Sequence, residues 1–319
     1  MRFLCPTCRE PLNKLPSNRV ACADHGEFGS VEENGLVVFD GCFDEHSFFD
    51  TQAMERLDRY YAHVGPEEFE DILARKELWE MDIGNKWVGI TEKYWWEKYT
   101  GRIRGRRVLE IGCGVNYITS YLLRSGNDVL SFDICKASID YQSKLLEQTG
   151  VARDRLTVAV ANAEQVELPG EFDYVDINNV LHHIYDKRAA LERAFRALKP
   201  GGQVLIVEPN YFYPLRWIIE TDLFDPFNFL KCYFVRNSLM EKDEKAIVFS
   251  ELRVLLQEVG FEIEVDEKDR NFFGSFVLRL LRDGTWMARL VFWLDQKVFG
   301  RVIPRYFAPF EYIVARRSA

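Results

Sequence analysis

The sequence has no apolar run of the roughly 20 residues that a membrane-spanning helix needs, because Arg, Lys, Asp or Glu interrupts every such run. It also has no apolar secretory core before its first cysteines, in MRFLCPTC. Both absences predict a cytoplasmic protein. Positive charge is in deficit as well, since 41 Lys and Arg stand against 50 Asp and Glu, a net charge of −9. This balance argues against nucleic acid as a partner unless a local basic patch overrides it.

Cysteine is present in an odd number, seven residues, which suits reduced thiols or a metal site better than a disulfide framework. Apolar residues are not scarce. They make up 47% of the 319 residues, enough for the core of one large α/β domain with a smaller module beside it.

The first forty residues carry two pairs of metal-ligand side chains. Cys5 and Cys8 stand in C-P-T-C, and Cys22 and His25 stand in C-A-D-H. Three sulfurs and one imidazole can complete a tetrahedron around Zn²⁺, and four filled positions predict a structural metal rather than a catalytic one. The alternative is ordinary buried cysteines and a surface histidine. A hairpin is predicted to follow around Asn34-Gly35.

Composition divides the chain into three parts. Residues 1–43 are predicted to form the zinc-ribbon-like module, and the charged, aromatic residues 44–104 a helical linker or cap. Residues 105–319 are predicted to form the main domain, with insertions at about 211–245 and 268–308 that are too rich in apolar and aromatic residues for ordinary surface loops.

The main domain alternates strand and helix patterns from Val108 onward. This alternation predicts an α/β fold with a doubly wound, mostly parallel sheet whose ligands bind at the carboxyl ends of the strands. The strand patterns lie at 108–111, 129–133, 156–160, 172–177 and 203–208, with helices at 117–125, 136–149 and 187–198.

The segment VLEIGCGVN ends the first of these strands at a glycine turn. A dinucleotide fingerprint needs a third glycine, but the chain has Tyr117 at that position. Gly112 and Gly114 still let a ligand approach the backbone, and Asp133 closes the next strand, where a carboxylate can hold ribose hydroxyls. The pattern therefore predicts a ligand with a ribose and without a diphosphate.

These motifs, together with the later FDYVDINNVLHHI, RALKPGG and VLIVEPN, resemble the class I S-adenosylmethionine-dependent methyltransferases over roughly residues 90–265. The N-terminal segment is similar to the small zinc-binding module at the start of many bacterial methyltransferases. The resemblance implies a Rossmann-like fold and S-adenosyl-L-methionine as cofactor. Asn162 departs from the usual Asp and implies a modestly lower affinity. The cofactor-binding residues it implies are Glu110, Gly112, Gly114, Asp133, Ile134, Asn162, Ala163 and Asn178.

Methyl transfer from a sulfonium is an in-line displacement, so positioning supplies much of the catalysis. An acidic acceptor also needs a base, and His183 is the first candidate, with His182 second. The alternative is that both histidines only pack or cap a helix. Residues 178–181 lack the N/D-P-P-Y that the family uses on exocyclic amines of nucleic-acid bases. Glu208 is a further pocket candidate.

The second insertion carries a helical apolar face and, over 279–305, six positive against two negative side chains. Such a segment can touch a membrane interface peripherally, pack on the sheet or pair two subunits. The apolar face consists of Met287, Leu290, Val291, Leu294 and Val298, with Trp286 and Trp293 beside it.

Taken together, the sequence predicts a methyltransferase acting on a small apolar or lipid-linked acceptor, at oxygen or carbon. One alternative is an rRNA base methyltransferase that recognises RNA through the zinc ribbon. Another is a methyltransferase-fold scaffold without catalysis.

Overall fold

A computed structural model describes residues 3–40, 98–114, 118–148, 151–210, 212–213, 247–269, 272 and 286–318. The predicted linker, up to residue 97, and nearly all of the first insertion lie outside the described residues. Of the second insertion, the structure describes residues 268, 269 and 272 and the stretch from Trp286 onward.

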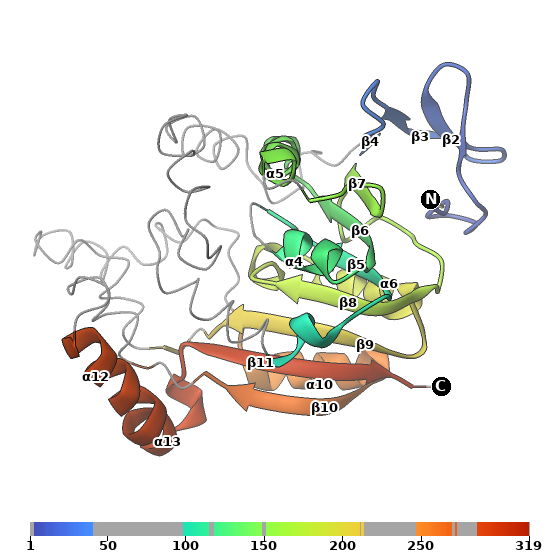
Figure 1. The fold of residues 1–319 in the computed structure, drawn as a ribbon. Helices are drawn as coiled ribbons and strands as arrows, with labels where there is room; N and C mark the ends of the chain where they lie inside the picture. Colours follow the sequence, from blue (N-terminus) through green and yellow to red (C-terminus); the bar gives the residue numbers. More distant parts are fainter. Residues whose placement is uncertain are drawn as a thin grey trace, which may run out of the picture.

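A parallel sheet forms the centre of the chain, as the sequence predicted (Figure 1). Its strand order is β7-β6-β5-β8-β9, and each neighbouring pair is parallel. β9 runs longer than predicted, because the expected K-P-G-G turn is included in it at a register irregularity. The strands are β5 (Arg107–Ile111), β6 (Asp128–Asp133), β7 (Leu156–Val160), β8 (Phe172–Asn178) and β9 (Leu198–Pro209).

Both faces of this sheet are covered, which is why its strands are apolar on both sides. Leu109 points into one core, to which α6 (Lys187–Ala197) and α10 (Phe249–Val259) contribute. Its neighbour Val108 points into the other core, to which α4 (Ile118–Arg124) and α5 (Lys136–Gln148) contribute. The sheet is therefore doubly wound, with the Rossmann-like arrangement expected from the resemblance to class I methyltransferases.

Two antiparallel strands complete the carboxyl-terminal side of the sheet. β11 (Phe310–Arg317) lies between β9 and β10 (Phe261–Lys268) and is antiparallel to both. Before β11 the chain forms α12 (Trp286–Leu294), a π-helical stretch at Asp295–Phe299 and the short α13 (Gly300–Val302). Among the described residues, no helix combines the length and hydropathy needed to cross a bilayer.

The N-terminal segment continues the same sheet. Its strands β1 (Asn13–Lys14), β2 (Arg19–Cys22), β3 (Gly26–Val31) and β4 (Val37–Phe39) pair antiparallel in succession, and the hairpin at Asn34-Gly35 is confirmed between β3 and β4. β4 then pairs parallel to the edge strand β7. The small segment therefore covers an edge that would otherwise expose unpaired backbone groups.

Candidate active site

The glycine turn after β5 forms one side of the site. Gly112 has φ +68°, and a Cβ atom there would lie 2.3 Å from a Cγ atom of Val180, so a side chain does not fit. Gly114 has φ +46° and donates its backbone N–H to Oδ2 of Asp133 at 2.8 Å. A Cβ atom at Gly114 would meet no other atom within 4 Å, so the space beside it is open.

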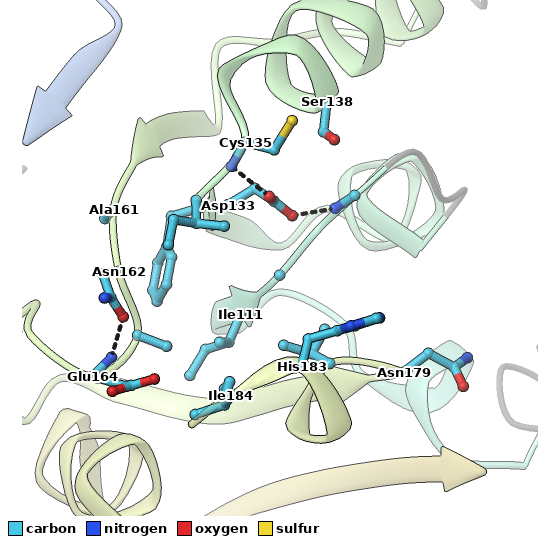
Figure 2. A pocket seen from close by; sticks show the side chains of 16 residues that line it. Ile111, Asp133, Cys135, Ser138, Ala161, Asn162, Glu164, Asn179, His183 and Ile184 are labelled. Atoms are coloured by element: carbon cyan, nitrogen blue, oxygen red, sulfur yellow. Dashed lines mark hydrogen bonds between the residues drawn. The ribbon is translucent and has the colours of Figure 1, made fainter. Parts of the chain in front are cut away.

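Asp133 ends β6 and faces this turn (Figure 2). Its Oδ1 accepts a hydrogen bond from the backbone N–H of Cys135 at 2.8 Å, while its Oδ2 accepts the one from Gly114. Burial raises the pKa of Asp133, and the hydrogen bonds from the backbone amides act in the opposite direction. Since each carboxylate oxygen can accept two hydrogen bonds, both oxygens retain capacity for the hydroxyl groups of a ligand.

A cavity lies between these groups and the ends of β7 and β8. Most of the residues predicted to bind the cofactor line it, together with His183. Asn162 stands after β7, where its Oδ1 accepts the backbone N–H of Glu164 at 2.8 Å. Apolar side chains form much of the wall (Figure 2). The lining residues are Ile111, Gly112, Gly114, Phe132, Asp133, Ile134, Cys135, Ser138, Ala161, Asn162, Ala163, Glu164, Asn179, Val180, His183 and Ile184.

Glu110 is not among the lining residues. Its carboxylate is buried under α4, where Oε2 accepts hydrogen bonds from the hydroxyls of Thr119 at 2.5 Å and Ser131 at 2.8 Å. Burial raises the pKa of Glu110 to about 8. The carboxyl group thus connects β5, β6 and α4 behind the glycine turn, and its predicted contact with the cofactor stays a prediction.

Asn178, also predicted to bind the cofactor, ends β8 and is 7% exposed without lining the cavity. Its Oδ1 accepts a hydrogen bond from Nδ2 of Asn179 at 2.8 Å. Asn179 has φ +56°, a conformation that Asn tolerates better than most residues, and lines the cavity instead. No sequence signal distinguished the two asparagines.

The two histidines belong to the short 3₁₀ turn Leu181–His183 after β8, with ring centroids 3.9 Å apart. His183 lines the cavity, whereas His182 is 9% exposed and pairs with Glu208, which is fully buried. Nδ1 of His182 lies 2.7 Å from Oε2 of Glu208. Because a carboxylate can only accept a hydrogen bond, a neutral His182 carries its proton on Nδ1 and donates it to Glu208. Its other ring nitrogen, Nε2, is then the one that can accept a proton.

Glu208 also holds the backbone of the same turn. Its Oε1 accepts the backbone N–H groups of Val180 at 2.8 Å and Leu181 at 2.6 Å. One carboxylate on β9 therefore positions the segment that carries both histidines. The sequence placed Glu208 near the pocket but contained no signal for this pairing.

A separate cluster lies in the N-terminal segment. The ligand atoms of Cys5, Cys8, Cys22 and His25 all lie within 4.8 Å of one another. Sγ of Cys22 is 3.6 Å from Sγ of Cys8 and 3.6 Å from Nδ1 of His25. The structure thus brings together all four side chains that the sequence singled out as metal ligands.

Comparison with known proteins agrees with this geometry. Residues 109–206 match a family described as "Methyltransferase domain". This match covers the centre of the parallel sheet, and the chain has the class I methyltransferase fold.

Among curated proteins, the chain is similar to the ubiquinone biosynthesis O-methyltransferase of Pseudomonas aeruginosa, 32% identical over 36% of this chain and 49% of the relative. The enzyme of the same name from Ralstonia nicotianae is 27% identical over 45% and 61%. The ubiquinone/menaquinone biosynthesis C-methyltransferase of Pectobacterium carotovorum is 31% identical over 35% and 48%. The chain thus spans about half the length of most of these relatives.

Solved structures agree on the fold alone. Phosphoethanolamine N-methyltransferase 2 of Haemonchus contortus, in complex with S-adenosyl-L-methionine, has a TM-score of 0.51 at 20% identity over 79% of this chain and 60% of that one. A proposed sarcosine dimethylglycine methyltransferase of Galdieria sulphuraria has a TM-score of 0.51 at 15% identity over 82% and 98%.

Proposed function

We propose that the protein is an S-adenosyl-L-methionine-dependent methyltransferase that methylates oxygen or carbon of a small apolar or lipid-linked acceptor. The observation that carries the proposal is the carboxylate of Asp133, held by the amides of Gly114 and Cys135 at one wall of the cavity. A carboxylate at the end of the second strand of such a sheet is suited to the vicinal hydroxyls of a ribose.

The residues present fit this cofactor. Asp133 would hold the ribose, and the open space beside Gly114 would admit the methionyl part. Ile134, Asn162 and Ala163 would enclose the adenine, with the oxygen of Asn162 as the hydrogen-bond acceptor. When bound, S-adenosyl-L-methionine supplies an electrophilic methyl group.

The choice of acceptor rests on the matched relatives and on the site. The relatives are named for O- and C-methylation in quinone biosynthesis, and the cavity wall is largely apolar around Phe132, Ile134 and Ile184. An acceptor of this kind also fits peripheral membrane contact through about residues 279–305, of which 286–305 are described.

Histidine would remove the proton from an acidic acceptor. The position of His183 suits it best to this role, because it lines the cavity. His182 is the alternative, because the tautomer of its neutral ring that donates Nδ1–H to Glu208 would accept a proton at Nε2, and Glu208 would stabilise the imidazolium that forms. In either case Glu208 is a positioning residue for the turn.

We also propose a structural Zn²⁺ bound by the four N-terminal ligands. Zinc bonds of about 2.3 Å to sulfur and 2.0–2.1 Å to nitrogen, at tetrahedral angles, imply edges of about 3.8 Å between two sulfurs and about 3.6 Å between sulfur and nitrogen. The separations of 3.6 Å between the sulfurs of Cys8 and Cys22 and 3.6 Å between Cys22 Sγ and His25 Nδ1 are close to these two values. With four protein ligands the ion would have no open position for chemistry.

The decisive experiment incubates the protein and methyl-labelled S-adenosyl-L-methionine with a cell extract that is then separated into organic-soluble, aqueous, RNA and protein fractions. Asp133→Ala serves as the blank, and calorimetry measures cofactor binding directly. Label in the organic fraction is expected. Label in RNA would establish the rRNA alternative, and cofactor binding without transfer to any fraction would favour the scaffold.

A further inference from the structure

The described part of the second insertion forms an exposed apolar surface. Eight of the ten large hydrophobic side chains exposed among the described residues lie between 286 and 307. Trp286 is 72% exposed, Val302 71% and Trp293 54%. We name this set the apolar ridge; its members are Trp286, Met287, Leu290, Trp293, Val298, Val302, Tyr306 and Phe307. Concentration of this kind marks an interaction surface rather than scattered surface residues.

The exposed charges of the ridge are of one sign. Lys297 and Arg301 are exposed, and neither has an ion-pair or hydrogen-bond partner among the described residues. The acidic residue of the segment, Asp295, is fully buried. Within the part of the segment that the structure describes, the patch therefore has two exposed cations and no exposed carboxylate, on a chain whose net charge is −9.

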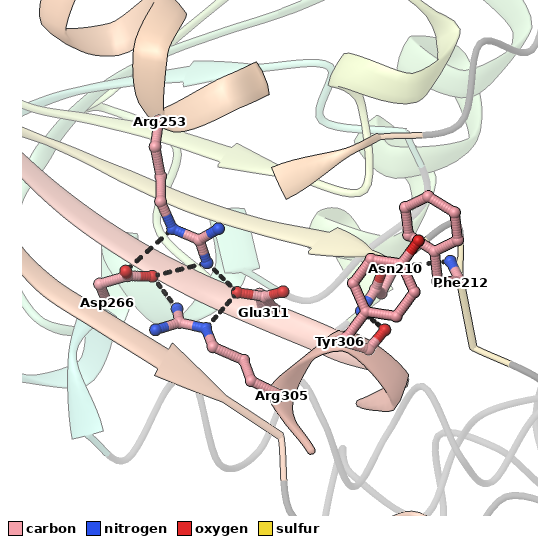
Figure 3. Close-up of polar contacts among 7 residues, drawn as sticks. All are labelled: Asn210, Phe212, Arg253, Asp266, Arg305, Tyr306 and Glu311. Atoms are coloured by element: carbon pink, nitrogen blue, oxygen red, sulfur yellow. Dashed lines mark hydrogen bonds and ion pairs between the residues drawn. The ribbon is translucent and has the colours of Figure 1, made fainter. Parts of the chain in front are cut away.

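The ridge is fixed to the sheet at its carboxyl-terminal end (Figure 3). Arg305 pairs with Asp266 of β10 and with Glu311 of β11, and Arg253 of α10 pairs with the same two carboxylates. Glu311 is 3% exposed, whereas the side chains of Arg253, Asp266 and Arg305 are 25%, 28% and 36% exposed, so this cluster of two cations and two anions is partly buried. The guanidinium of Arg305 is therefore committed to the fold rather than to a partner.

A second set of contacts ties the ridge to the catalytic edge. The ring of Tyr306 stacks on Phe212 with centroids 4.0 Å apart, and its backbone oxygen accepts a hydrogen bond from Nδ2 of Asn210 at 3.0 Å. Asn210 follows β9 two residues after Glu208. In Figure 1, α12 and α13 lie beyond the edge of the sheet toward which β8 and β9 point. The ridge and the cavity thus share the carboxyl edge.

We propose that the apolar ridge docks on an anionic lipid bilayer and holds the carboxyl edge of the sheet against the membrane. Tryptophan and tyrosine suit the interface, where an apolar ring and a polar edge are both satisfied, and Lys297 and Arg301 would reach the lipid phosphates. A second copy of the chain fits less well, because the cores of protein interfaces are depleted of lysine. The docking deepens the proposed function, since it would deliver a lipid-linked acceptor to the cavity.

Sedimentation with vesicles tests the proposal on the full chain. Vesicles of phosphatidylcholine alone are compared with equimolar phosphatidylcholine and phosphatidylglycerol. Because each cation near an anionic surface contributes about 1 kcal/mol, the double variant Lys297→Gln/Arg301→Gln is expected to bind the mixed vesicles about thirtyfold more weakly. The matched control is Arg102→Gln/Arg104→Gln, which removes two exposed cations elsewhere and should bind like the wild type.

The apolar contribution is tested by Trp293→Ser, with Val254→Ser on α10 as the control of similar exposure. Loss of vesicle binding only in the ridge variant supports the docking. Wild-type protein that stays in solution with both vesicle types overturns it, as does binding that the two ridge variants leave unchanged. A wild-type dimer that Trp293→Ser converts to a monomer would assign the ridge to self-association instead. Calorimetry with S-adenosyl-L-methionine reports on the proposed function independently, since the ridge variants are expected to retain cofactor binding.

Discussion

The substitution Glu208→Gln separates positioning from catalysis at the histidine turn. The amide oxygen of Gln can still accept the backbone N–H groups of Val180 and Leu181, but its NH₂ group then faces Nδ1 of His182. To keep that contact, His182 must accept at Nδ1 and carry its proton on Nε2. The substitution therefore inverts the tautomer and removes the basic nitrogen while the shape of the site is kept.

The expected size follows from the three hydrogen bonds to the carboxylate. Loss of the charge weakens each by about 1 kcal/mol, and relief from burying a charge offsets part of this, so we expect a net loss of about 1–2 kcal/mol in the free energy of unfolding. Glu208→Ala leaves the backbone N–H groups of Val180 and Leu181 without their acceptor beside the space vacated by the side chain. It should lower the free energy of unfolding by about 3–5 kcal/mol. If His182 takes the proton, kcat in Glu208→Gln falls about 10²–10⁴-fold with little change in cofactor affinity.

The assay measures methyl transfer to a catechol- or quinol-type acceptor, with urea unfolding and the ¹⁵N shifts of the imidazole as structural readouts. Glu258→Gln, which removes an exposed carboxylate paired with Arg188, is the control and should stay within about 0.5 kcal/mol of wild type. An inverted tautomer with unchanged kcat would refute the role of His182 as base and leave His183. An unchanged tautomer would refute the geometry on which the argument rests.

Four further outcomes are expected. Asp133→Asn should lower the affinity for S-adenosyl-L-methionine at least tenfold in calorimetry, because its NH₂ group must face one of two backbone donors; full affinity would contradict the ribose assignment. Gly112→Ala should destabilise the fold by about 1–3 kcal/mol, and Val180→Ala should partly restore it, which a double-mutant cycle measures. Burial raises the pKa of Glu110 from 4.5 to about 8, so its protonation stabilises the fold at low pH and this stability is lost as the pH rises from about 5 to 8; thermal unfolding of Glu110→Gln should lack that decline, and an identical decline would exclude Glu110 as its source. Metal analysis should find one zinc per chain, and Cys22→Ser or a chelator should remove it and unfold the N-terminal segment, whereas metal-free protein of full stability would contradict the site.

The fold could be read from the sequence because each strand ends in a recognisable signal. VLEI before the glycines and VLSFD before the next helix gave the strands β5 and β6 to within one residue. The sequence also singled out Gly114 and Asp133, which a hydrogen bond joins at the ends of these strands. Local patterns of this kind depend on neighbouring residues, so one chain without relatives is enough to find them.

The pair of His182 and Glu208 could not be found in the same way, because it depends on sheet order and register. β8 and β9 are neighbours, and Asn178 lies opposite Val207. Glu208, the next residue of β9, therefore lies beside the turn that follows Asn178. The same limit explains the asparagines, since only the backbone at Asn179, with φ +56°, decides which side chain reaches the cavity.

The N-terminal segment shows how sheet edges escape sequence analysis. The two pairs of predicted metal ligands indicated a separate module. Strand pairing is made by backbone groups, so no residue of β4 signals that its partner is β7. The pairing has a consequence for the site. Leu36, just before β4, packs with Ile139 and Val160 around Cys113, the residue between the two glycines of the turn. Loosening of the N-terminal segment would thus remove apolar contacts from the residue between the two glycines of the turn that faces Asp133. The proposed metal ligands and the proposed cofactor site therefore belong to one continuous structure.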